Sequence, residues 1–235
     1  APISYSKRET EYTRLANDTL QGTRVGSSAG GEQPKFTALI QKEKLFFHVI
    51  VKFSPPTKTK EGRRWADLLF AEELALTLLK EDGYLSAQAE AFESEGRGFL
   101  QVTRFDRIGR KGRKGTLTLG GIDDEYVGSR SNWTSTALRL NELKLIKKQD
   151  MDTIIFLDCF GAHIANSDRH HGNLSLYWEL GAKSFALAPV YDMLPMLYAP
   201  TQGNIVTREF KKPVMQFEQI QAWKSARTLA TKFWQ

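Results

Sequence analysis

The sequence is poor in cysteine, with Cys159 as the only one among 235 residues. One thiol cannot form a disulfide within the chain, so a cross-linked framework is excluded and a reducing compartment is expected. Long apolar runs are missing as well, because no stretch approaches the roughly 18 residues that indicate a membrane-spanning helix. We therefore expect a cytoplasmic protein that makes no use of a membrane.

Two motifs of phosphate and acyl chemistry are absent or out of place. The Walker A pattern Gly-X4-Gly-Lys-Ser/Thr does not occur, which excludes the P-loop class of nucleotide-binding proteins. Residues 26–30 match Gly-X-Ser-X-Gly, the nucleophile elbow of serine hydrolases. That elbow follows a strand of a parallel sheet, whereas only a short helix is expected before Ser28. A serine hydrolase is therefore rejected.

Basic residues outnumber acidic ones, 33 to 27, which gives a net charge of +6 and an isoelectric point near 9.3. Such a balance suits a polyanionic partner, and ATP, nucleic acid and phosphorylated protein all qualify. The stretch Arg107–Gly115 is both basic and rich in glycine. A solvated linker is favoured there over a binding patch.

Strand patterns concentrate in the first half of the chain and helical patterns in the second. We expect a helix at 7–21, strands at 36–40 and 45–53, a helix at 65–79, and strands at 87–92 and 98–105. A long helical stretch follows at 138–165 with a break near Gln149–Asp150, and two short strands are expected at 174–177 and 184–187. The order predicts an α+β protein with a small β-rich lobe at 1–106 and a helical lobe at 107–235.

The segment from Asn166 to Asn173 reads Asn-Ser-Asp-Arg-His-His-Gly-Asn. Asp168 stands five residues before Asn173, the spacing that separates the base from a magnesium ligand in a protein-kinase catalytic loop. Asp192 follows within Val-Tyr-Asp-Met, where a second magnesium-binding aspartate is expected. Mg²⁺ prefers hard oxygen ligands and takes few of them from protein. The three side chains predict phosphoryl transfer from ATP, with Asp168 as base and Asn173 and Asp192 as metal ligands.

The residues between Asp168 and Asn173 leave several roles open. Arg169 can steady the loop or the charge of the transferring phosphoryl group. His170 is interpreted as a hydrogen-bonded side chain that stabilises the loop beside the nucleotide site. His170 and His171 with Asp168 also suggest a metal hydrolase, but zinc needs three converging ligands and only His163 is near, so this alternative is disfavoured.

Lys52 ends the apolar run 46–51, after a glycine-rich loop and one pair of strands. A lysine at this place in a protein kinase contacts the α- and β-phosphates of ATP and pairs with a glutamate on the next helix. Glu72 and Glu73 both lie on the helix expected at 65–79. The sequence does not separate these two candidates.

Together these features resemble the HipA-like family of bacterial serine/threonine kinases, the toxins of some toxin–antitoxin modules. The glycine-rich loop also resembles that of the YjjJ subgroup. The resemblance implies a kinase-like bilobal fold, ATP and Mg²⁺ as cofactors, and phosphorylation of a protein serine or threonine. It is carried by five segments: Ser27–Lys35, Val51–Lys52, Arg104–Arg107, Asn166–Asn173 and Ala188–Leu194.

The resemblance also implies roles for single residues of the β-rich lobe. Glu72 matches the helix glutamate better than Glu73, and the backbone from Thr103 to Phe105 matches the hinge that holds adenine. The backbone amides of the glycine-rich loop line a phosphate, because glycine permits close approach; these are Ala29, Gly30 and Gly31.

A serine of the glycine-rich loop can be autophosphorylated in this family, and the loop then leaves the site. Ser27 matches that serine, with Ser28 as the second candidate. A phosphate group adds nearly two negative charges and repels the phosphates of ATP, which gives the switch a physical basis.

Partners are implied only by the resemblance: a protein substrate such as an aminoacyl-tRNA synthetase, an antitoxin, and DNA through a partner or a further domain. The chain opens on Ala-Pro-Ile-Ser without methionine, so we expect a fragment of a longer protein. The alternative function is a catalytically inactive kinase-like module that binds nucleotide or DNA. A salt-dependent affinity for DNA that survives Asp168→Ala would favour it.

Overall fold

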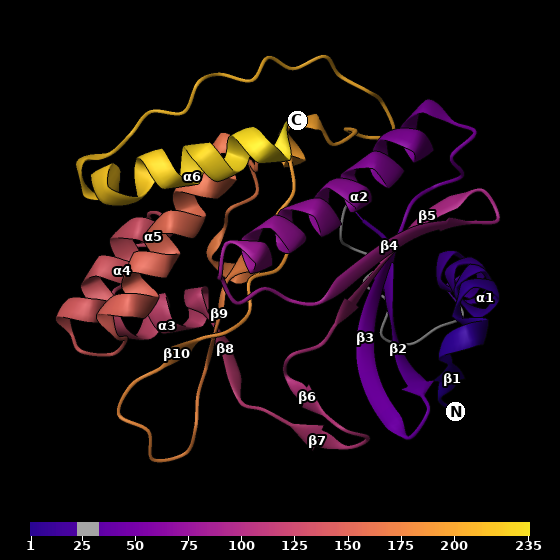
Figure 1. Cartoon of the computed structure of the whole chain (residues 1–235), viewed down its shortest axis with the longest axis horizontal. Coiled ribbons are helices and arrows are strands. Elements are labelled where there is room, and N and C mark those ends of the chain that lie inside the picture. Colours follow the sequence, from indigo (N-terminus) through magenta and orange to yellow (C-terminus); the bar gives the residue numbers. More distant parts are fainter. Residues whose placement is uncertain (23–32) are drawn as a thin grey trace. The chain divides into compact units, whose positions relative to one another are not determined.

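The computed structural model describes residues 1–22 and 33–235. These residues form two compact units, each built from separate stretches of the chain (Figure 1). The sheet unit contains 1–73, 87–113 and 199–207, and the helical unit contains 74–86, 114–198 and 208–235. The lobe boundary expected between residues 106 and 107 stays a prediction.

The sheet unit is built on a five-stranded sheet in the order β1-β2-β3-β5-β4. Only β1 and β2 pair in parallel, and the central hairpin of β2 and β3 pairs Lys35 with Lys52 at its open end. Alternation with period two buries Val49, Val51 and Phe53 of β3 on one face. The strands are β1 Ile3–Ser4, β2 Lys35–Lys42, β3 Leu45–Phe53, β4 Ala89–Ser94 and β5 Arg97–Thr103.

Helix α1 (Arg8–Leu20) supplies the other side of this core. Tyr12, Leu15 and Ala16 are buried at helical spacing, and the Tyr12 ring contacts the rings of Phe36, Phe92 and Phe99. The buried Tyr12 hydroxyl donates to Oε1 of Gln101 at 2.6 Å, so the aromatic cluster contains no unsatisfied phenol. The helix expected at 7–21 is confirmed.

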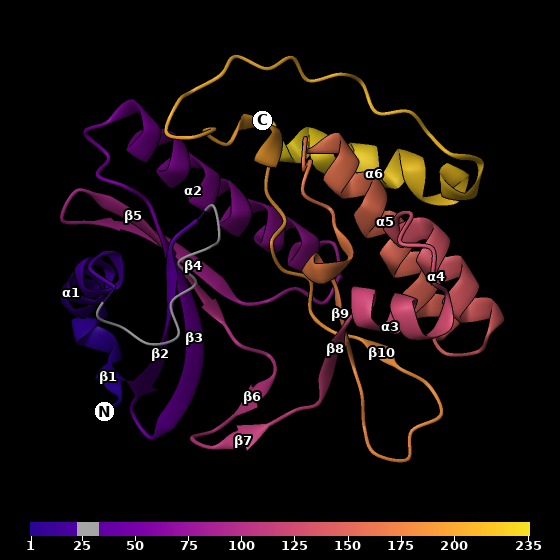
Figure 2. The ribbon, with the colours of Figure 1, turned by 180° about the vertical axis from the view of Figure 1, so that it is seen from behind.

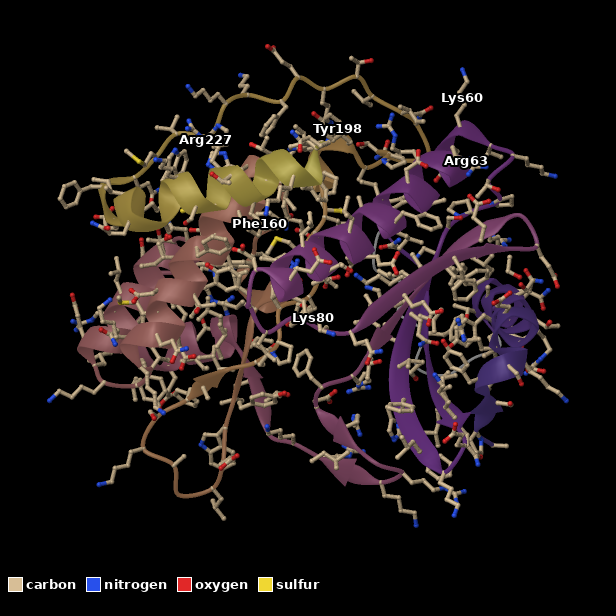
Figure 3. The ribbon with its side chains drawn as sticks, viewed as in Figure 1. Lys60, Arg63, Lys80, Phe160, Tyr198 and Arg227 are labelled. Carbon is tan, nitrogen blue, oxygen red and sulfur yellow. The ribbon has the colours of Figure 1, made fainter. Side chains whose placement is uncertain are left out.

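Helix α2 (Lys60–Glu81) begins five residues before the helix expected at 65–79. Thr59 explains the earlier start, because its hydroxyl accepts a hydrogen bond from the backbone N–H of Gly62 at 2.9 Å. Near this end Arg63, labelled in Figure 3, forms an ion pair with Glu93 of β4. The helix packs closely on β5 because Gly98 has no side chain: a Cβ there would lie 2.7 Å from Cβ of Ala66.

The stretch expected to be a solvated linker is ordered instead. Strands β6 (Arg107–Ile108) and β7 (Gly112–Arg113) form a separate two-stranded ribbon within the sheet unit. Ile108 faces Gly112 across this ribbon, so only the residues between them form the turn.

The helical unit is centred on α5 (Lys148–His163), which packs against α4 (Trp133–Glu142) and α6 (Ile220–Phe233), as Figure 2 shows. A three-stranded sheet in the order β10-β9-β8 and helix α3 (Leu119–Tyr126) complete the unit. Its strands are β8 Thr116–Thr118, β9 Ser175–Tyr177 and β10 Ala186–Leu187, and its 3-10 turns are η2 His171–Asn173, η3 Met196–Tyr198 and η4 Phe217–Gln219. A further 3-10 turn, η1 (Tyr5–Lys7), precedes α1 in the sheet unit.

The helical stretch expected at 138–165 is interrupted between Glu142 and Lys148, earlier than the predicted break near Gln149–Asp150. Lys144 adopts a left-handed backbone with φ of 60°, which ends α4. Asp150 lies instead in the first turn of α5, where an acidic side chain suits the positive end of the helix dipole. In residues 1–22 and 33–235, no helix combines the length and the apolar character needed to cross a bilayer.

Candidate active site

The candidate residues fall into two clusters, one in each unit. Lys52, Glu72 and the segment Thr103–Phe105 belong to the sheet unit. The segment 166–173 and Asp192 belong to the helical unit. The residues expected to line the phosphates or to be autophosphorylated lie outside the described part of the chain: Ser27, Ser28, Ala29, Gly30 and Gly31.

Lys52 forms a buried ion pair on the central strand of its sheet. The strand β3 is hydrogen-bonded on both sides, to β2 and to β5, so its penultimate residue is held at a fixed position. The Nζ atom of Lys52 lies 2.8 and 2.6 Å from the two carboxylate oxygens of Glu72 on α2. Lys52 is 6% exposed and Glu72 is fully buried. Of the two glutamates that the sequence left open, Glu72 is therefore the one in contact.

A lysine held this way suits the binding of anionic phosphates. The two contacts with the Glu72 carboxylate fix the direction of the long lysine side chain, so less rotamer entropy is lost when an anion binds. A buried charge pair is also expensive to desolvate, and such pairs are weak evidence for stability alone. Its retention in the core fits a functional role.

The segment from Thr103 to Phe105 follows directly from the end of β5. The backbone N–H of Thr103 donates to the carbonyl of Gln88 at 2.8 Å, and that of Arg104 donates to the carbonyl of His48 at 2.8 Å. Both donors are therefore used inside the sheet unit. Any hydrogen bond from this segment to an adenine ring needs other backbone groups of the segment.

The loop that contains Asp168 starts where α5 ends. Ala165 adopts φ of 61°, and the N–H of Asn166 returns to the carbonyl of Gly161 at 2.9 Å, which closes the helix end. The chain then runs through the turn η2 into β9. The loop is thus anchored by a helix at one end and by a strand at the other.

Asn166 connects this loop to the segment around Asp192. Its side chain is 1% exposed, and its Oδ1 accepts a hydrogen bond from the N–H of Asp168 at 3.0 Å. Its Nδ2 donates to the backbone carbonyl of Asp192 at 3.3 Å. One buried amide therefore hydrogen-bonds to the backbone of both Asp168 and Asp192 and helps to fix their positions. The sequence marked Asn166 as part of the motif but gave it no role.

Asp168 and Asn173 contact each other across the loop. The Nδ2 atom of Asn173 donates to the backbone carbonyl of Asp168 at 2.9 Å and lies 3.4 Å from its Oδ2. Among the described residues no hydrogen bond engages Oδ1 of Asn173, so this oxygen is available to a cation. The Asp168 carboxylate is half exposed. The arrangement combines a half-exposed carboxylate on Asp168 with an amide oxygen on the buried Asn173 side chain that has no partner among the described residues.

Arg169 points away from Asp168 and back onto α5. Its Nε atom donates to Oδ1 of Asp158 at 3.1 Å, and its guanidinium also donates to the carbonyl of Asn166. Gly161 gives it room, since a Cβ there would lie 2.5 Å from Cδ of Arg169. This geometry favours the first of the two roles proposed for Arg169, which is to steady the loop.

Asp158 collects hydrogen bonds from three parts of the helical unit. Besides Arg169, its carboxylate accepts from the hydroxyl of Thr134 at 2.7 Å and from Nε2 of Gln219 at 3.4 Å. Asp158 is 5% exposed and Gln219 is 6% exposed. The buried carboxylate therefore joins α4, α5 and the start of the C-terminal helix to the loop. Sequence reasoning did not identify it.

The two histidines of the loop have structural partners. Nδ1 of His170 accepts the N–H of Gly172 at 3.0 Å, so His170 caps the turn η2. Nε2 of His171 lies 2.9 Å from Oγ1 of Thr136, whose proton goes to Oδ2 of Asp123. Because that proton is used, His171 must donate through Nε2–H when neutral.

A zinc site receives no support from these histidines. Within residues 1–22 and 33–235, no three His, Cys, Asp or Glu side chains lie close enough together to bind a metal ion as a cluster. His163 contacts the ring of Trp223, with 4.5 Å between ring centroids, on another part of the helical unit. The metal-hydrolase alternative therefore stays disfavoured.

Asp192 has a backbone conformation that aspartate tolerates but does not prefer. Its φ is 53°, in the left-handed region. The preceding residue fixes the segment, because the hydroxyl of Tyr191 donates to the carbonyl of Gly172 at 2.9 Å and lies 2.7 Å from Oγ of Ser175. Strain of this kind is retained where the surrounding structure enforces it, and it concentrates at functional sites.

Two buried histidines make the stability of the helical unit depend on pH. Burial lowers the pKa of His171 below its ordinary value of 6.5, and burial together with Arg227 (Figure 3) lowers that of His163. In the unfolded chain both histidines take up protons as the pH falls through about 6.5, whereas the folded state resists until lower pH. The free energy of unfolding therefore decreases as the pH falls below about 6.5.

We expect urea denaturation to show this loss between pH 7.5 and pH 5.5. His171→Gln should flatten the dependence, because glutamine can still donate to Thr136 and has no proton to gain. Equal slopes for wild type and His171→Gln would show that His171 is not responsible.

Residues 27–233 match the family model of the HipA-like C-terminal domain. The chain belongs to the HipA-like family. It is 40% identical over 237 residues to Toxin YjjJ of Escherichia coli strain K12, across the whole of this chain and 53% of that protein. The chain thus spans about half the length of this curated relative. The match also supports the YjjJ subgroup, as the glycine-rich loop predicts.

Solved structures give the fold of this HipA-like chain. HipA of Shewanella oneidensis MR-1, solved with HipB and its operator DNA, superposes with a TM-score of 0.56 at 18% identity, over 88% of this chain and 54% of that one. The kinase CtkA of Helicobacter pylori superposes with a TM-score of 0.49 at 16% identity, over 70% of this chain and 54% of that one. The likeness to HipA confirms the predicted kinase-like α+β fold.

Proposed function

We propose that this HipA-like chain is a serine/threonine protein kinase that uses ATP and Mg²⁺. The observation that carries the proposal is the loop from Asp168 to Asn173. Its hydrogen bonds hold the Asp168 carboxylate half exposed and leave Oδ1 of Asn173 without a partner among the described residues. The Asn173 side chain is buried, and a buried amide oxygen without a hydrogen-bond partner calls for an explanation.

The donor set fits a magnesium ion. Asn173 offers an amide oxygen and Asp192 a carboxylate, both hard ligands, and Mg²⁺ completes its shell with water and substrate phosphates. Bound Mg²⁺ would neutralise the charge of the β- and γ-phosphates. Lys52, held by Glu72, would bind the α- and β-phosphates of ATP.

Asp168 would orient the hydroxyl of the substrate and accept its proton. The hydroxyl oxygen forms a bond to the γ-phosphorus, and the bond from that phosphorus to the β-phosphate oxygen breaks, so ADP leaves. Asn166 keeps Asp168 and Asp192 in register through their backbones, and Arg169 keeps the loop on α5.

The proposals for autophosphorylation, antitoxin and substrate come from the resemblance to the HipA-like family. Ser27, or else Ser28, would be the site of autophosphorylation, and an antitoxin would be the partner that restrains activity. The name Toxin YjjJ for a relative at 40% identity supports the toxin assignment. A protein substrate, for which an aminoacyl-tRNA synthetase is the candidate, is supported only by the family resemblance.

Intact-mass spectrometry after incubation with Mg-ATP tests the proposal. We expect wild type to gain about 80 Da, one phosphoryl group, with the modified peptide covering Ser27 and Ser28, and Asp168→Ala to gain nothing. Asp168 is exposed, so this substitution should leave the unfolding transition unchanged. ATP binding without mass gain, in the presence of a generic serine-rich protein as acceptor, would favour the inactive binding module instead.

A further inference from the structure

The ribbon β6–β7 carries exposed positive charge at its tip and along one strand. Arg110, Lys111 and Arg113 are exposed. Within the described ranges none of the three forms an ion pair. This distinguishes them from most arginines of the chain, which are neutralised by carboxylates: Arg8, Arg14, Arg63, Arg104, Arg107, Arg130, Arg139 and Arg169.

The ribbon is a regular secondary-structure element with a defined turn. Gly109 has φ of 55°, and a Cβ at Gly112 would lie 2.6 Å from the carbonyl oxygen of Ile108, so both positions favour glycine. At its base the side chains of Arg104 and Arg107 clamp Asp106, with distances of 2.6 and 3.2 Å. The charged tip is therefore presented in one orientation.

Two contacts fix the tip to the neighbouring strand β3. Nε2 of His48 lies 3.2 Å from the backbone carbonyl of Arg110. The guanidinium of Arg110 lies 5.5 Å from the centroid of the Phe46 ring, within the range of a cation–π interaction. Arg110 is thus partly ordered before any partner binds, which lowers the entropy lost on binding.

The turn between β2 and β3 extends the positive surface. Figures 1 and 2 both show this turn beside the ribbon, within the sheet unit. It adds exposed Lys42 and Lys44, with Glu43 between them as the acidic residue. We call the resulting patch the hairpin surface, and it consists of Lys42, Lys44, Arg110, Lys111 and Arg113.

We propose that the hairpin surface binds nucleic acid through its phosphate backbone. Unpaired like charges on adjacent turns repel each other, and a polyanion relieves that repulsion. Duplex DNA carries one charge per ~1.7 Å of axis, and its major groove admits a two-stranded ribbon. Arginine adds bidentate hydrogen bonds to phosphate oxygens.

The composition of the ribbon favours a nucleic acid over an acidic protein. Protein interfaces have a centre that is depleted of charge and enriched in aromatic side chains. In this ribbon, residues 109–113 are instead two glycines and the cations Arg110, Lys111 and Arg113, and Ile108 is the exposed apolar residue beside them. The ribbon offers charge and hydrogen-bond donors, and the small glycines let a backbone approach closely.

Fluorescence polarisation with labelled probes tests this surface. The probes are a 25-base-pair DNA duplex and a single-stranded RNA of the same sequence, whose comparison shows which backbone is preferred. We expect the triple variant Arg110→Ala/Lys111→Ala/Arg113→Ala to bind at least about tenfold more weakly at low salt. The slope of log K against log salt should fall by roughly 2 to 3, one for each phosphate group that the variant no longer neutralises.

A variant of equal net charge provides the control. Lys7→Ala/Lys60→Ala/Lys144→Ala removes three exposed lysines from elsewhere on the surface and should bind as wild type does. Equal losses in the two triple variants would overturn the proposal, because binding would then follow net charge alone. Competition by a polyglutamate peptide as strong as that of unlabelled DNA would overturn it too and point to an acidic protein.

Two further measurements separate a loss of nucleic-acid binding from a defect in folding or catalysis. Thermal unfolding of both triple variants is compared first, and if the ribbon variant is destabilised, the single change Lys111→Glu at the exposed tip replaces it. Asp168→Ala should bind the probes as wild type does, so a failure of the proposed kinase activity does not affect the result. Unchanged probe binding by Lys111→Glu would exclude the ribbon as the nucleic-acid-binding site.

Discussion

Asp158→Ala is expected to lower the free energy of unfolding by about 3 to 5 kcal/mol, the range found when one member of a buried ion pair is removed. The carboxylate is 5% exposed and accepts hydrogen bonds from Thr134, Arg169 and Gln219. Its loss leaves a partly buried guanidinium without its ion-pair partner, removes the acceptor of the Thr134 hydroxyl, and takes away one of the two acceptors of the Gln219 amide. Urea denaturation at pH 7.5 measures the change.

Asp152→Ala is the matched control, because Asp152 lies on the same helix in an exposed ion pair with Lys148 at 2.6 Å. An exposed i,i+4 pair contributes about 0.3 to 0.5 kcal/mol, so this variant should remain close to wild type. The double variant Asp158→Leu/Arg169→Met removes both charges and should recover part of the loss. Equal destabilisation by Asp158→Ala and Asp152→Ala would contradict the central position given to Asp158.

Asp192→Gly is expected to lower phosphoryl transfer by at least about 10³-fold while leaving stability within roughly 1 kcal/mol of wild type. The prediction rests on the proposed kinase activity. Glycine adopts the φ of 53° at Asp192 without strain, so the backbone should keep its path and its hydrogen bond from Asn166. The substitution removes the carboxylate together with the interactions that it makes. Phosphate incorporation and Mg-dependent ATP binding report the functional effect, and thermal unfolding reports the structural one.

Lys144→Gly controls for the backbone change. Lys144 has φ of 60° and is exposed in the loop between α4 and α5. We expect the stability of the Lys144→Gly variant to change as little as that of Asp192→Gly, and we expect Lys144→Gly to keep full phosphoryl transfer. If Asp192→Gly retains activity, Asp192 is not a metal ligand and the proposed site loses one of its two oxygen donors.

The strand pairs of the sheet unit and helix α1 were accessible from sequence because their patterns are local. Alternation in β3 and the helical spacing of Tyr12, Leu15 and Ala16 need no knowledge of distant segments. The same kind of signal exists in α6, where Ala226, Leu229, Ala230 and Phe233 are buried at helical spacing, and it could have identified that helix. By contrast, β8 has three residues and forms only by pairing with β9, about 60 residues later in the chain.

The candidate site shows the same division. The spacing of Asp168, Asn173 and Asp192 could be recognised from the sequence, and so could a lysine at the end of a buried strand. The contributions of Asp158 and Asn166 depend on an arginine folding back onto α5 and on an amide reaching a loop 26 residues away. The break after Glu142 depends on a lysine in a left-handed conformation, which no propensity indicates.

The interleaving of the two units has a consequence for synthesis on the ribosome. The sheet unit is not complete after Arg113, since 199–207 also belongs to it, and the helical unit combines 74–86 with 208–235. At about 5 to 20 residues per second, Arg113 leaves the peptidyl-transferase centre seconds before Ala199 is made. The sheet unit therefore cannot finish folding until 199–207 has been made, and the helical unit cannot finish until 208–235 has been made, although most of each unit is synthesised earlier.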